Sequence, residues 1–317
     1  DFNMKNKTIL SVVAALSLNV SGAIAMEYKG PTFDLSQVQP EFRVGYLPDE
    51  PAAETLARNE CMVPYYEAAL NVPVKQFTFN DNAGAIEAFL GGNLDMIWFG
   101  SSAYSSVEIE KPGFAAPIMT RVQPTGDIGY YSIMIALKES GIESVADMKG
   151  KHFAFGDPDS TSGTLVPSVV LPEELGMPIE NHFGEVSFSG SHEATVLGVL
   201  NGDYDAGVTW VSGVGEWDEG YTSGQLNTMV KKGVLNMDDI VQVWSSALIP
   251  NGPHTVPATF PTGGSTALLG MQKWIHANDK ECSENHTNGE VKGWISVDSS
   301  FYEAIVAVKK AQLESAR

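Results

Sequence analysis

The sequence predicts a protein of the α/β class, built from two similar α/β lobes that are joined by a hinge of two strands. Helix and strand patterns alternate along the chain, and one helix–turn–strand pattern occurs twice. A Pro/Gly-rich connector, QPTGDIG (123–129), lies between the two copies. With 317 residues, the chain has room for two domains.

The first unit alternates strands and helices in the order expected for a parallel sheet. Three short apolar runs are typical of strands: FRVGYL (42–47), VKQFTF (74–79) and DMIWFG (95–100). Two segments between them are typical of helices: MVPYYEAAL (62–70), with a proline near its start, and AGAIEAFL (83–90), closed by two glycines.

The second unit repeats this alternation. Its predicted strands are YYSIMIAL (130–137), HFAF (152–155) and DAGVTW (205–210). SHEATVLGVL (191–200) is a predicted helix, and Ser191 is its expected N-cap. The stretch from Ala194 to Trp210 resembles the stretch from Ala85 to Gly100, because each has an apolar helix, a Gly/Asp-containing turn and a Trp-bearing strand.

Residues 41–124 are expected to form the first part of lobe I, residues 125–244 lobe II, and residues 245–317 the hinge return and the rest of lobe I with C-terminal helices. The second connector is predicted within IVQVWSSALIPNGP (240–253). Two chain crossings imply a cleft and a hinge between the lobes. Ligands of open α/β sheets bind beyond the carboxyl ends of strands, so residues that follow strands are the candidates.

The N-terminal segment is typical of a secretory signal peptide. Lys5 and Lys7 precede an apolar run that begins at Ile9 and ends near Val20, and Ala-Ile-Ala (23–25) follows as a cleavage site. We therefore expect residues 1–25 to comprise a signal peptide and upstream residues, and the protein to be exported to the periplasm. A membrane anchor is the alternative, although the apolar run is short for a span.

Two cysteines, Cys61 and Cys282, can pair in an oxidising compartment or remain two buried thiols. His276, Cys282 and His286 have irregular spacing, so no metal ligand set and no cofactor are predicted. The net charge of −20 argues against a nucleic-acid partner, which would require a basic surface.

The sequence GDPDSTSGT (156–164) concentrates hydroxyl groups at a strand-to-helix junction. Hydroxyl donors, together with the unpaired N–H groups of a helix N-terminus, form a site for an oxyanion. Ser160, Thr161 and Ser162 supply the donors, and Gly163 keeps the backbone accessible. The alternative is an ordinary capped turn, because turns are rich in the same residues. A nucleotide P-loop is not indicated, because its lysine is missing.

Other polar and aromatic residues are expected near the same cleft. His192, at the start of a predicted helix, can donate to an anion oxygen or can be a surface histidine. Tyr46, Tyr104 and Trp210 can wall the cleft or pack in the core, and Glu216 and Asp218 can bind an ammonium group or form a solvated loop.

Four motifs together resemble the periplasmic substrate-binding proteins of phosphonate and phosphite ABC transporters, a branch of the type II periplasmic-binding-protein fold. The motifs lie between residues 41 and 275: WFGSSAY, DPDSTSG, SGSHEATVLGVLNGDYDAG and WSSALIPNGP. The resemblance implies that the phosphonate oxygens bind Ser160, Thr161, Ser162 or its neighbours, and His192, and that Tyr46 and Tyr104 line the other lobe.

In aminophosphonate binders of this family, acidic side chains hold the ammonium group. Here the corresponding region has Ser212 and Asn251 instead, so Glu216 or Asp218 is expected to take that role. The resemblance implies a monomeric binding protein that captures a small phosphonate, preferably 2-aminoethylphosphonate, and delivers it to an ABC permease. A phosphite or alkylphosphonate binder is the alternative, and a binder of sulfonate or phosphate is another.

An enzyme of the same fold is a further alternative, and catalysis is not expected. Ser162 and His192 suggest nucleophilic chemistry, but the chain has no G-x-S-x-G elbow.

Overall fold

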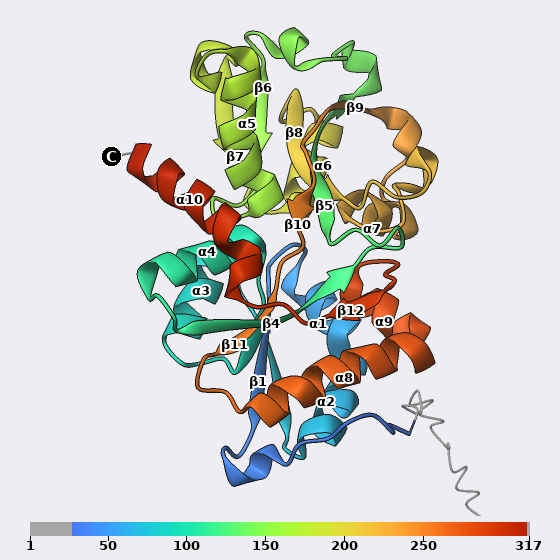
Figure 1. The fold of residues 1–317 in the computed structure, drawn as a ribbon. Coiled ribbons are helices and arrows are strands. Elements are labelled where there is room, and N and C mark those ends of the chain that lie inside the picture. The colour runs from blue at the N-terminus through green and yellow to red at the C-terminus, as the bar shows by residue number, and fades with distance from the viewer. Residues whose placement is uncertain (1–26, 316–317) are drawn as a thin grey trace, which may run out of the picture.

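The computed structural model describes residues 27–315, which form two α/β lobes stacked one above the other (Figure 1). The predicted fold class is confirmed. The predicted signal peptide lies outside the described residues. Among the residues described, no helix combines the length and the apolar character needed to cross a membrane.

Lobe I is built on a mixed sheet with the strand order β12-β4-β11-β3-β1-β2. Its strands are β1 (Phe42–Tyr46), β2 (Val74–Thr78), β3 (Met96–Trp98), β4 (Ala115–Val122), β11 (His254–Pro257) and β12 (Gly293–Ile295). Its helices are α1 (Ala52–Asn59), α2 (Val63–Leu70), α3 (Asn82–Leu90), α4 (Ser101–Glu110), α8 (Thr262–Asn278), α9 (Lys280–Thr287) and α10 (Glu303–Ser315).

Lobe II has the strand order β10-β5-β8-β6-β7, and β9 pairs with β5. Its strands are β5 (Gly129–Leu137), β6 (His152–Phe155), β7 (Glu185–Phe188), β8 (Ala206–Val211), β9 (Ile240–Ser245) and β10 (Ile249–Pro250). Its helices are α5 (Val166–Leu175), α6 (His192–Asn201) and α7 (Gln225–Lys231). The chain passes between the two sheets at residues 123–128 and 251–253.

The two stretches that resemble each other in sequence also make the same pattern of hydrogen bonds. In lobe I, Asp95 Oδ2 accepts from Arg43 N at 2.7 Å, and Asp95 N donates to Arg43 O. In lobe II, Asp205 Oδ2 accepts from His152 N at 2.8 Å, and Asp205 N donates to His152 O. In both lobes, therefore, an aspartate before the Trp-bearing strand fixes that strand against its parallel neighbour.

Each lobe buries apolar side chains on both faces of its sheet. In β1, Phe42, Val44 and Tyr46 point to one core, whereas Ile97 of β3 points to the core on the opposite face. This alternation follows from the period of two along a strand. Because both faces are covered, the strands read as nearly continuous apolar runs in the sequence.

Direct contacts hold the lobes together. Asn82 N donates to Asp157 Oδ2 at 3.0 Å, and Ser102 N donates to Thr161 Oγ1 at 2.8 Å. Helix α10 of lobe I also runs beside lobe II (Figure 1), where Lys309 Nζ lies 3.2 Å from Asp159 Oδ1. The structure therefore describes the lobes in a closed arrangement.

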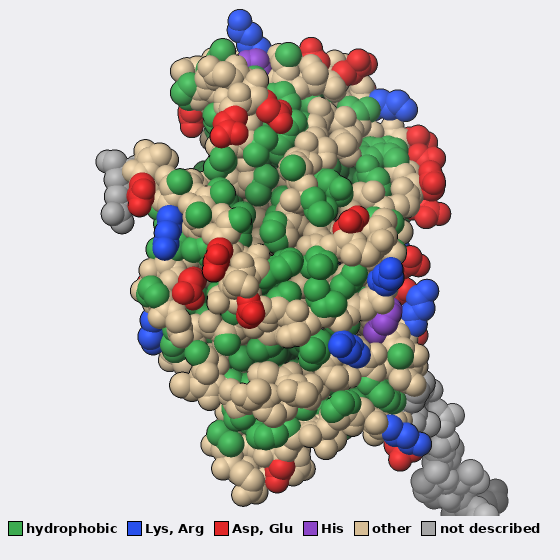
Figure 2. All heavy atoms as spheres, viewed as in Figure 1, with side chains coloured by type: hydrophobic (Ala, Val, Ile, Leu, Met, Phe, Trp, Pro, Cys, Tyr) green, Lys and Arg blue, Asp and Glu red, His purple; other side chains and the backbone are tan. Residues whose placement is uncertain are grey.

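A cluster of charges bridges the lobes at another point. Lys232, directly after α7, contacts Glu50 and Glu54 of lobe I as well as Glu193 of lobe II. On the face shown in Figure 2, acidic side chains are spread over both lobes, and basic side chains lie singly or in small groups. This distribution agrees with the net charge of −20.

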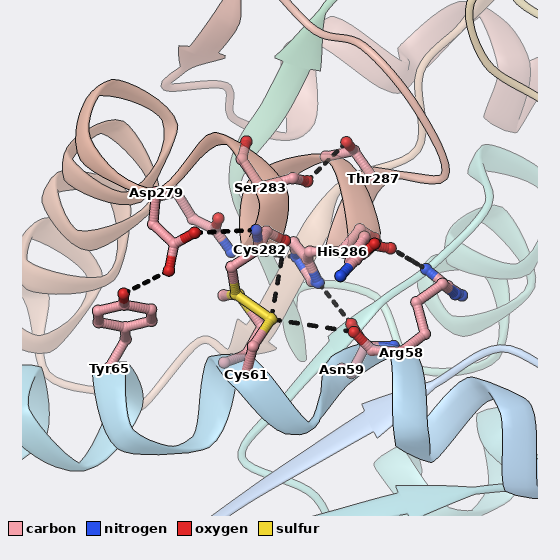
Figure 3. The surroundings of a disulfide bond; sticks show 12 residues. Arg58, Asn59, Cys61, Tyr65, Asp279, Cys282, Ser283, His286 and Thr287 are labelled. Atoms are coloured by element: carbon pink, nitrogen blue, oxygen red, sulfur yellow. Dashed lines mark hydrogen bonds between the residues drawn. A yellow bond between two sulfur atoms is a disulfide. The ribbon is translucent and has the colours of Figure 1, made fainter. Parts of the chain in front are cut away.

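The two cysteines form a disulfide bond between Cys61 and Cys282. Cys61 lies in the short 3-10 helix Glu60–Met62 between α1 and α2, and Cys282 lies in the first turn of α9 (Figure 3). The bond therefore attaches the C-terminal part of lobe I to its N-terminal part, across a sequence separation of 221 residues.

We expect the double substitution Cys61→Ser/Cys282→Ser to lower the free energy of unfolding by about 2–5 kcal/mol, because the cross-link restricts the unfolded chain. Urea unfolding of the oxidised protein and of the variant measures the difference. The wild type treated with a reductant is the matched control and should behave like the variant. Equal stability of all three samples would contradict this expectation.

Candidate ligand site between the lobes

A cavity of about 110 Å³ lies between the lobes, at the level of the two chain crossings. For scale, an engineered apolar cavity of about 150 Å³ in another protein holds one benzene molecule. The cavity can therefore hold a small molecule of a few non-hydrogen atoms. Its lining combines hydroxyl, imidazole, guanidinium and carboxylate groups with aromatic rings.

The hydroxyl-rich stretch forms one wall of the cavity. It begins a π-helical turn, η5 (Thr161–Leu165), that continues into α5. Ser160 caps this turn, and its Oγ accepts from Gly163 N at 3.0 Å. A Cβ on Gly163 would lie 2.8 Å from that oxygen, so the cap requires glycine. The N–H groups of Thr161 and Ser162 lie in the first turn, where helices lack internal acceptors.

Two of these hydroxyl groups use a lone pair to accept from the backbone. Ser160 Oγ accepts from Gly163 N, and Thr161 Oγ1 accepts from Ser102 N of lobe I. A hydroxyl group has one proton to donate. These two bonds therefore do not use the protons of Ser160 and Thr161, and both residues line the cavity.

His192 lies in the first turn of α6, and its ring faces the same wall. Its Nε2 lies 3.3 Å from Ser160 Oγ, and its Nδ1 lies 3.5 Å from Thr209 Oγ1. Burial lowers the pKa of His192, while Asp49 and Asp157 oppose the shift. The imidazole is consequently neutral at pH 7 and can offer one N–H to a ligand.

Aromatic rings form the other walls. Tyr46 of β1, Trp98 of β3 and His286 of α9 come from lobe I, and Tyr130 of β5 and Trp210 of β8 come from lobe II. The ring centroids of Tyr130 and Trp210 are 5.7 Å apart, in an edge-to-face arrangement. Burial raises the pKa of Tyr130, while hydrogen bonding with Ser162 and Thr161 opposes the shift.

Charged groups in the cavity are few and differ in their pairing. Arg58 Nε lies 2.6 Å from Glu50 Oε1, so its charge is balanced within the protein. Asp49 is partly buried, and its carboxylate makes no hydrogen bond or ion pair to the described residues. Burial raises the pKa of Asp49, whereas the nearby His192 and Arg58 oppose the shift. Arg121 is the second guanidinium in the lining.

A buried network fixes His286 beside the disulfide (Figure 3). Its Nδ1 donates to Asn59 Oδ1 at 2.7 Å, and its Nε2 accepts from Gln272 Nε2 at 3.1 Å. His254 Nε2 lies 3.2 Å from His286 Nε2. Burial lowers the pKa of His286 to about 3. The network and the disulfide together hold the end of α9 against the cavity.

The structure brings six of the nine residues predicted for the site into the lining. They are Tyr46, Ser160, Thr161, Ser162, His192 and Trp210.

Tyr104, expected as a wall of the cleft, does not line the cavity. The segment after β3 is not a loop but the first turns of α4, and this helix directs Tyr104 into the core against Tyr302. The ring centroids of these tyrosines are 5.2 Å apart, and burial raises the pKa of Tyr104 to about 12.

Glu216 and Asp218, expected as the ammonium site, are exposed and lie outside the lining. Their loop folds back on itself, since Tyr221 N donates to Glu216 O. Asn227 Nδ2 of α7 also donates to the carbonyl oxygens of Glu219 and Tyr221. These bonds hold the loop on α7 and leave its carboxylates in solvent.

Several lining residues were missed by the sequence analysis. Asp49 follows β1 by three positions, so the rule that favours residues after strands would have included it. Arg121 and Tyr130 flank the first connector, where a cleft between lobes must lie. His286 and Asn288 have no such signal, because their position depends on the network around the disulfide.

Two α/β lobes with a small-molecule cavity at their chain crossings define the class of type II periplasmic binding proteins. Residues 44–302 match the family described as ABC transporter, phosphonate, periplasmic substrate-binding protein. Because the match covers most of the chain, the protein belongs to this family.

Two solved structures share the fold. One is a binding-protein component of an ABC phosphonate transporter from Pseudomonas aeruginosa, with a TM-score of 0.71, 22% identity and coverage of 86% of each chain. The other is PhnD1 from Prochlorococcus marinus in complex with methylphosphonate, with a TM-score of 0.70, 22% identity and coverage of 86% of this chain and 98% of that chain.

The chain is also similar in sequence to curated proteins. It is 29% identical over 211 residues to the phosphate-import protein PhnD of Mycolicibacterium smegmatis, covering 64% of this chain. It is 28% identical over 187 residues to PhnD1 of Prochlorococcus marinus, a probable phosphite-binding protein, covering 57% of this chain. The chain spans 62% and 60% of the lengths of these two relatives.

The buried neutral His286 predicts a loss of stability in acid. Its pKa is about 3 in the folded protein and about 6.5 when unfolded. Below the unfolded value, the unfolded chain binds a proton that the folded protein does not, so stability falls as the pH falls. The expected contribution is about 2 kcal/mol between pH 7 and pH 5.

Urea unfolding at both pH values measures this loss. The variant His286→Gln should lose about 2 kcal/mol less than the wild type over this interval. His276→Gln, at a partly exposed position on α8, is the matched control and should lose as much as the wild type. An unchanged pH dependence in His286→Gln would contradict the prediction.

Proposed function

We propose that the protein is an exported, periplasmic binding protein that captures a phosphonate between its lobes and delivers it to an ABC permease. The observation that carries the proposal is the cradle formed by Ser160, Thr161 and Ser162. Two of its hydroxyl groups accept from backbone N–H groups, and these bonds do not use the hydroxyl protons. With free helix N–H groups and His192 beside them, several donors converge on one point, as a tetrahedral oxyanion requires.

The preferred ligand is 2-aminoethylphosphonate, and Asp49 is the partner for its ammonium group. Asp49 lines the cavity, and no cation of the described residues forms an ion pair with it. It lies close enough to His192 to oppose the shift in the pKa of that ring. An ammonium group two carbons from a phosphonate in the cradle therefore has a carboxylate within the same small cavity.

A small alkylphosphonate or phosphite is the second candidate. The cavity is small, and the relatives include a structure with methylphosphonate and a probable phosphite-binding protein. Such ligands need the cradle but no partner for an amine.

The role is binding and not catalysis. The hydroxyl of Ser160, next to His192, also accepts from Gly163 N as the cap of its helical turn. We expect the protein to act as a monomer, with the closed form docking on the permease. Ligand binding would then increase the fraction of molecules whose lobes are in the closed arrangement.

A thermal-shift panel on the mature protein tests the function. The ligands are 2-aminoethylphosphonate, methylphosphonate, phosphite, phosphate and taurine. At a concentration a hundred times its dissociation constant, a ligand stabilises the protein by about 2.7 kcal/mol. We expect the largest shift with 2-aminoethylphosphonate and a smaller one with methylphosphonate. In Ser160→Ala, the shift caused by each phosphonate should shrink.

If phosphite or methylphosphonate gave the largest shift, the role of the cradle would be supported and the preference for an amine-bearing ligand would be wrong. A shift led by phosphate or taurine, or no shift with any phosphonate, would overturn the proposed function.

Asp49→Asn tests the amine site. The substitution should weaken binding of 2-aminoethylphosphonate by about 1–3 kcal/mol, because it removes one partner of a charge-assisted hydrogen bond. Binding of methylphosphonate should change little, and titration calorimetry measures both. Glu216→Gln is the matched control, because Glu216 is exposed outside the cavity. Equal losses for the two ligands would remove Asp49 from this role, and a selective loss in Glu216→Gln would assign the role to that loop.

A further inference from the structure

Arg121 is a buried cation that forms no ion pair with the described residues, although the charge of Asp49 acts on it within the same cavity. Its side chain belongs to the last part of β4, is 6% exposed and lines the cavity. Among the described residues, no carboxylate forms an ion pair with it, whereas Arg58 in the same cavity is paired with Glu50. Burial lowers the pKa of Arg121 to about 10, so the guanidinium stays protonated at neutral pH.

The hydrogen bonds of Arg121 use only part of the guanidinium. Nη1 donates to Thr287 O at 2.7 Å, and Nε lies at 3.5 Å from Asn251 Oδ1. A guanidinium has five N–H donors. Nη2 makes no hydrogen bond to the described residues, and the side chain borders the cavity. Donors therefore remain for a group inside the cavity.

Two tryptophans, one from each lobe, cover the guanidinium. Its carbon lies 5.3 Å from the ring of Trp98 in β3 and 4.8 Å from the ring of Trp210 in β8. Asn251, which also contacts Arg121, belongs to the second chain crossing, and its Nδ2 donates to Arg121 O at 2.9 Å. Arg121 thus lies beside the second chain crossing, between two rings that belong to different lobes.

A charge in this position is costly unless something neutralises it. Removing an ion from water costs several kcal/mol in a protein, and a desolvated cation–π contact returns about 2 kcal/mol or more, so the contacts offset only part of the cost. The cradle is close by, because its residues and Arg121 line the same small cavity. Tyr130 of this lining hydrogen-bonds with Ser162 and Thr161, and the charge of Arg121 opposes the rise in the pKa of Tyr130. An oxyanion in the cradle would bring a negative charge next to the guanidinium.

We propose that Arg121 is the counter-ion of the bound ligand and makes the cavity selective for doubly charged oxyanions such as phosphonates over singly charged ones such as sulfonates. The proposal rests on the proposed function, because it requires an oxyanion in the cradle. In this proposal Arg121 discriminates between ligands by their charge, whereas the hydroxyl groups of the cradle discriminate by shape. Because the two tryptophans belong to different lobes, neutralisation of Arg121 also favours closure.

The test compares two ligands of nearly equal shape and different charge, methylphosphonate and methanesulfonate, at about pH 8.5, where most of the phosphonate is doubly ionised. Titration calorimetry gives both affinities for the wild type, Arg121→Gln and Arg121→Lys. Gln keeps a hydrogen-bond donor and removes the charge, and Lys keeps the charge. We expect the wild type to prefer methylphosphonate, and Arg121→Gln to bind it about 100-fold more weakly, with most of the preference lost. Arg121→Lys should restore much of the preference.

Stability of the ligand-free protein separates this role from a structural one. A buried charge without an ion-pair partner carries a desolvation cost, which an apolar side chain of similar size removes. Ligand-free Arg121→Met should therefore melt at the wild-type temperature or above it. Trp fluorescence of Arg121→Met, followed during titration with methylphosphonate, should show a weakened closure signal.

The outcomes distinguish the two proposals. If the wild type binds no phosphorus oxyanion, the proposed function itself is wrong. If the wild type binds methylphosphonate and Arg121→Gln keeps the same affinity and the same preference over methanesulfonate, only the role of Arg121 is overturned. A large loss of ligand-free stability in both Arg121→Met and Arg121→Gln, with wild-type selectivity in the folded fraction, would also assign Arg121 a structural role.

Discussion

The hydrogen bond from Ser102 N to Thr161 Oγ1 is the contact on which the site depends. It joins the first turn of α4 in lobe I to the hydroxyl cradle of lobe II, so the cradle is complete only when the lobes meet. It uses a lone pair of Thr161 Oγ1 and not the hydroxyl proton, because an oxygen that already accepts can still donate. One interaction therefore links the position of the lobes to the donor character of the site.

The backbone around this contact explains why the cradle lies where it does. Each lobe presents strand ends and helix N-termini to the other, since parallel strands carry their ligand sites beyond their carboxyl ends. The turn η5 and the first turn of α6 bring unpaired N–H groups to the same wall, with Ser160 and His192 side by side. The acidic surface of the protein does not exclude this arrangement, because local N–H groups and Arg121 add positive potential inside the cavity.

Much of this arrangement could be predicted from the sequence. Apolar runs and capping residues located most strands and helices of the two units, and the hydroxyl-rich stretch indicated the cradle. Tyr104 was misplaced because α4 begins directly after β3, and a helix turns its fourth residue toward the core, where a loop would not. Glu216 and Asp218 were misplaced because bonds from Asn227 hold their loop on α7. Such long-range contacts leave no local pattern in a single sequence.

The disulfide has a consequence for the integrity of the chain. Both cysteines belong to lobe I, and all of lobe II lies between them in the sequence. A single cut by a protease at any exposed loop between Cys61 and Cys282 would leave the two fragments covalently joined. The same order means that the bond can form only after the whole segment of lobe II has been synthesised. The cross-link therefore requires both ends of lobe I to be present, and it keeps the two fragments of a cleaved chain covalently joined.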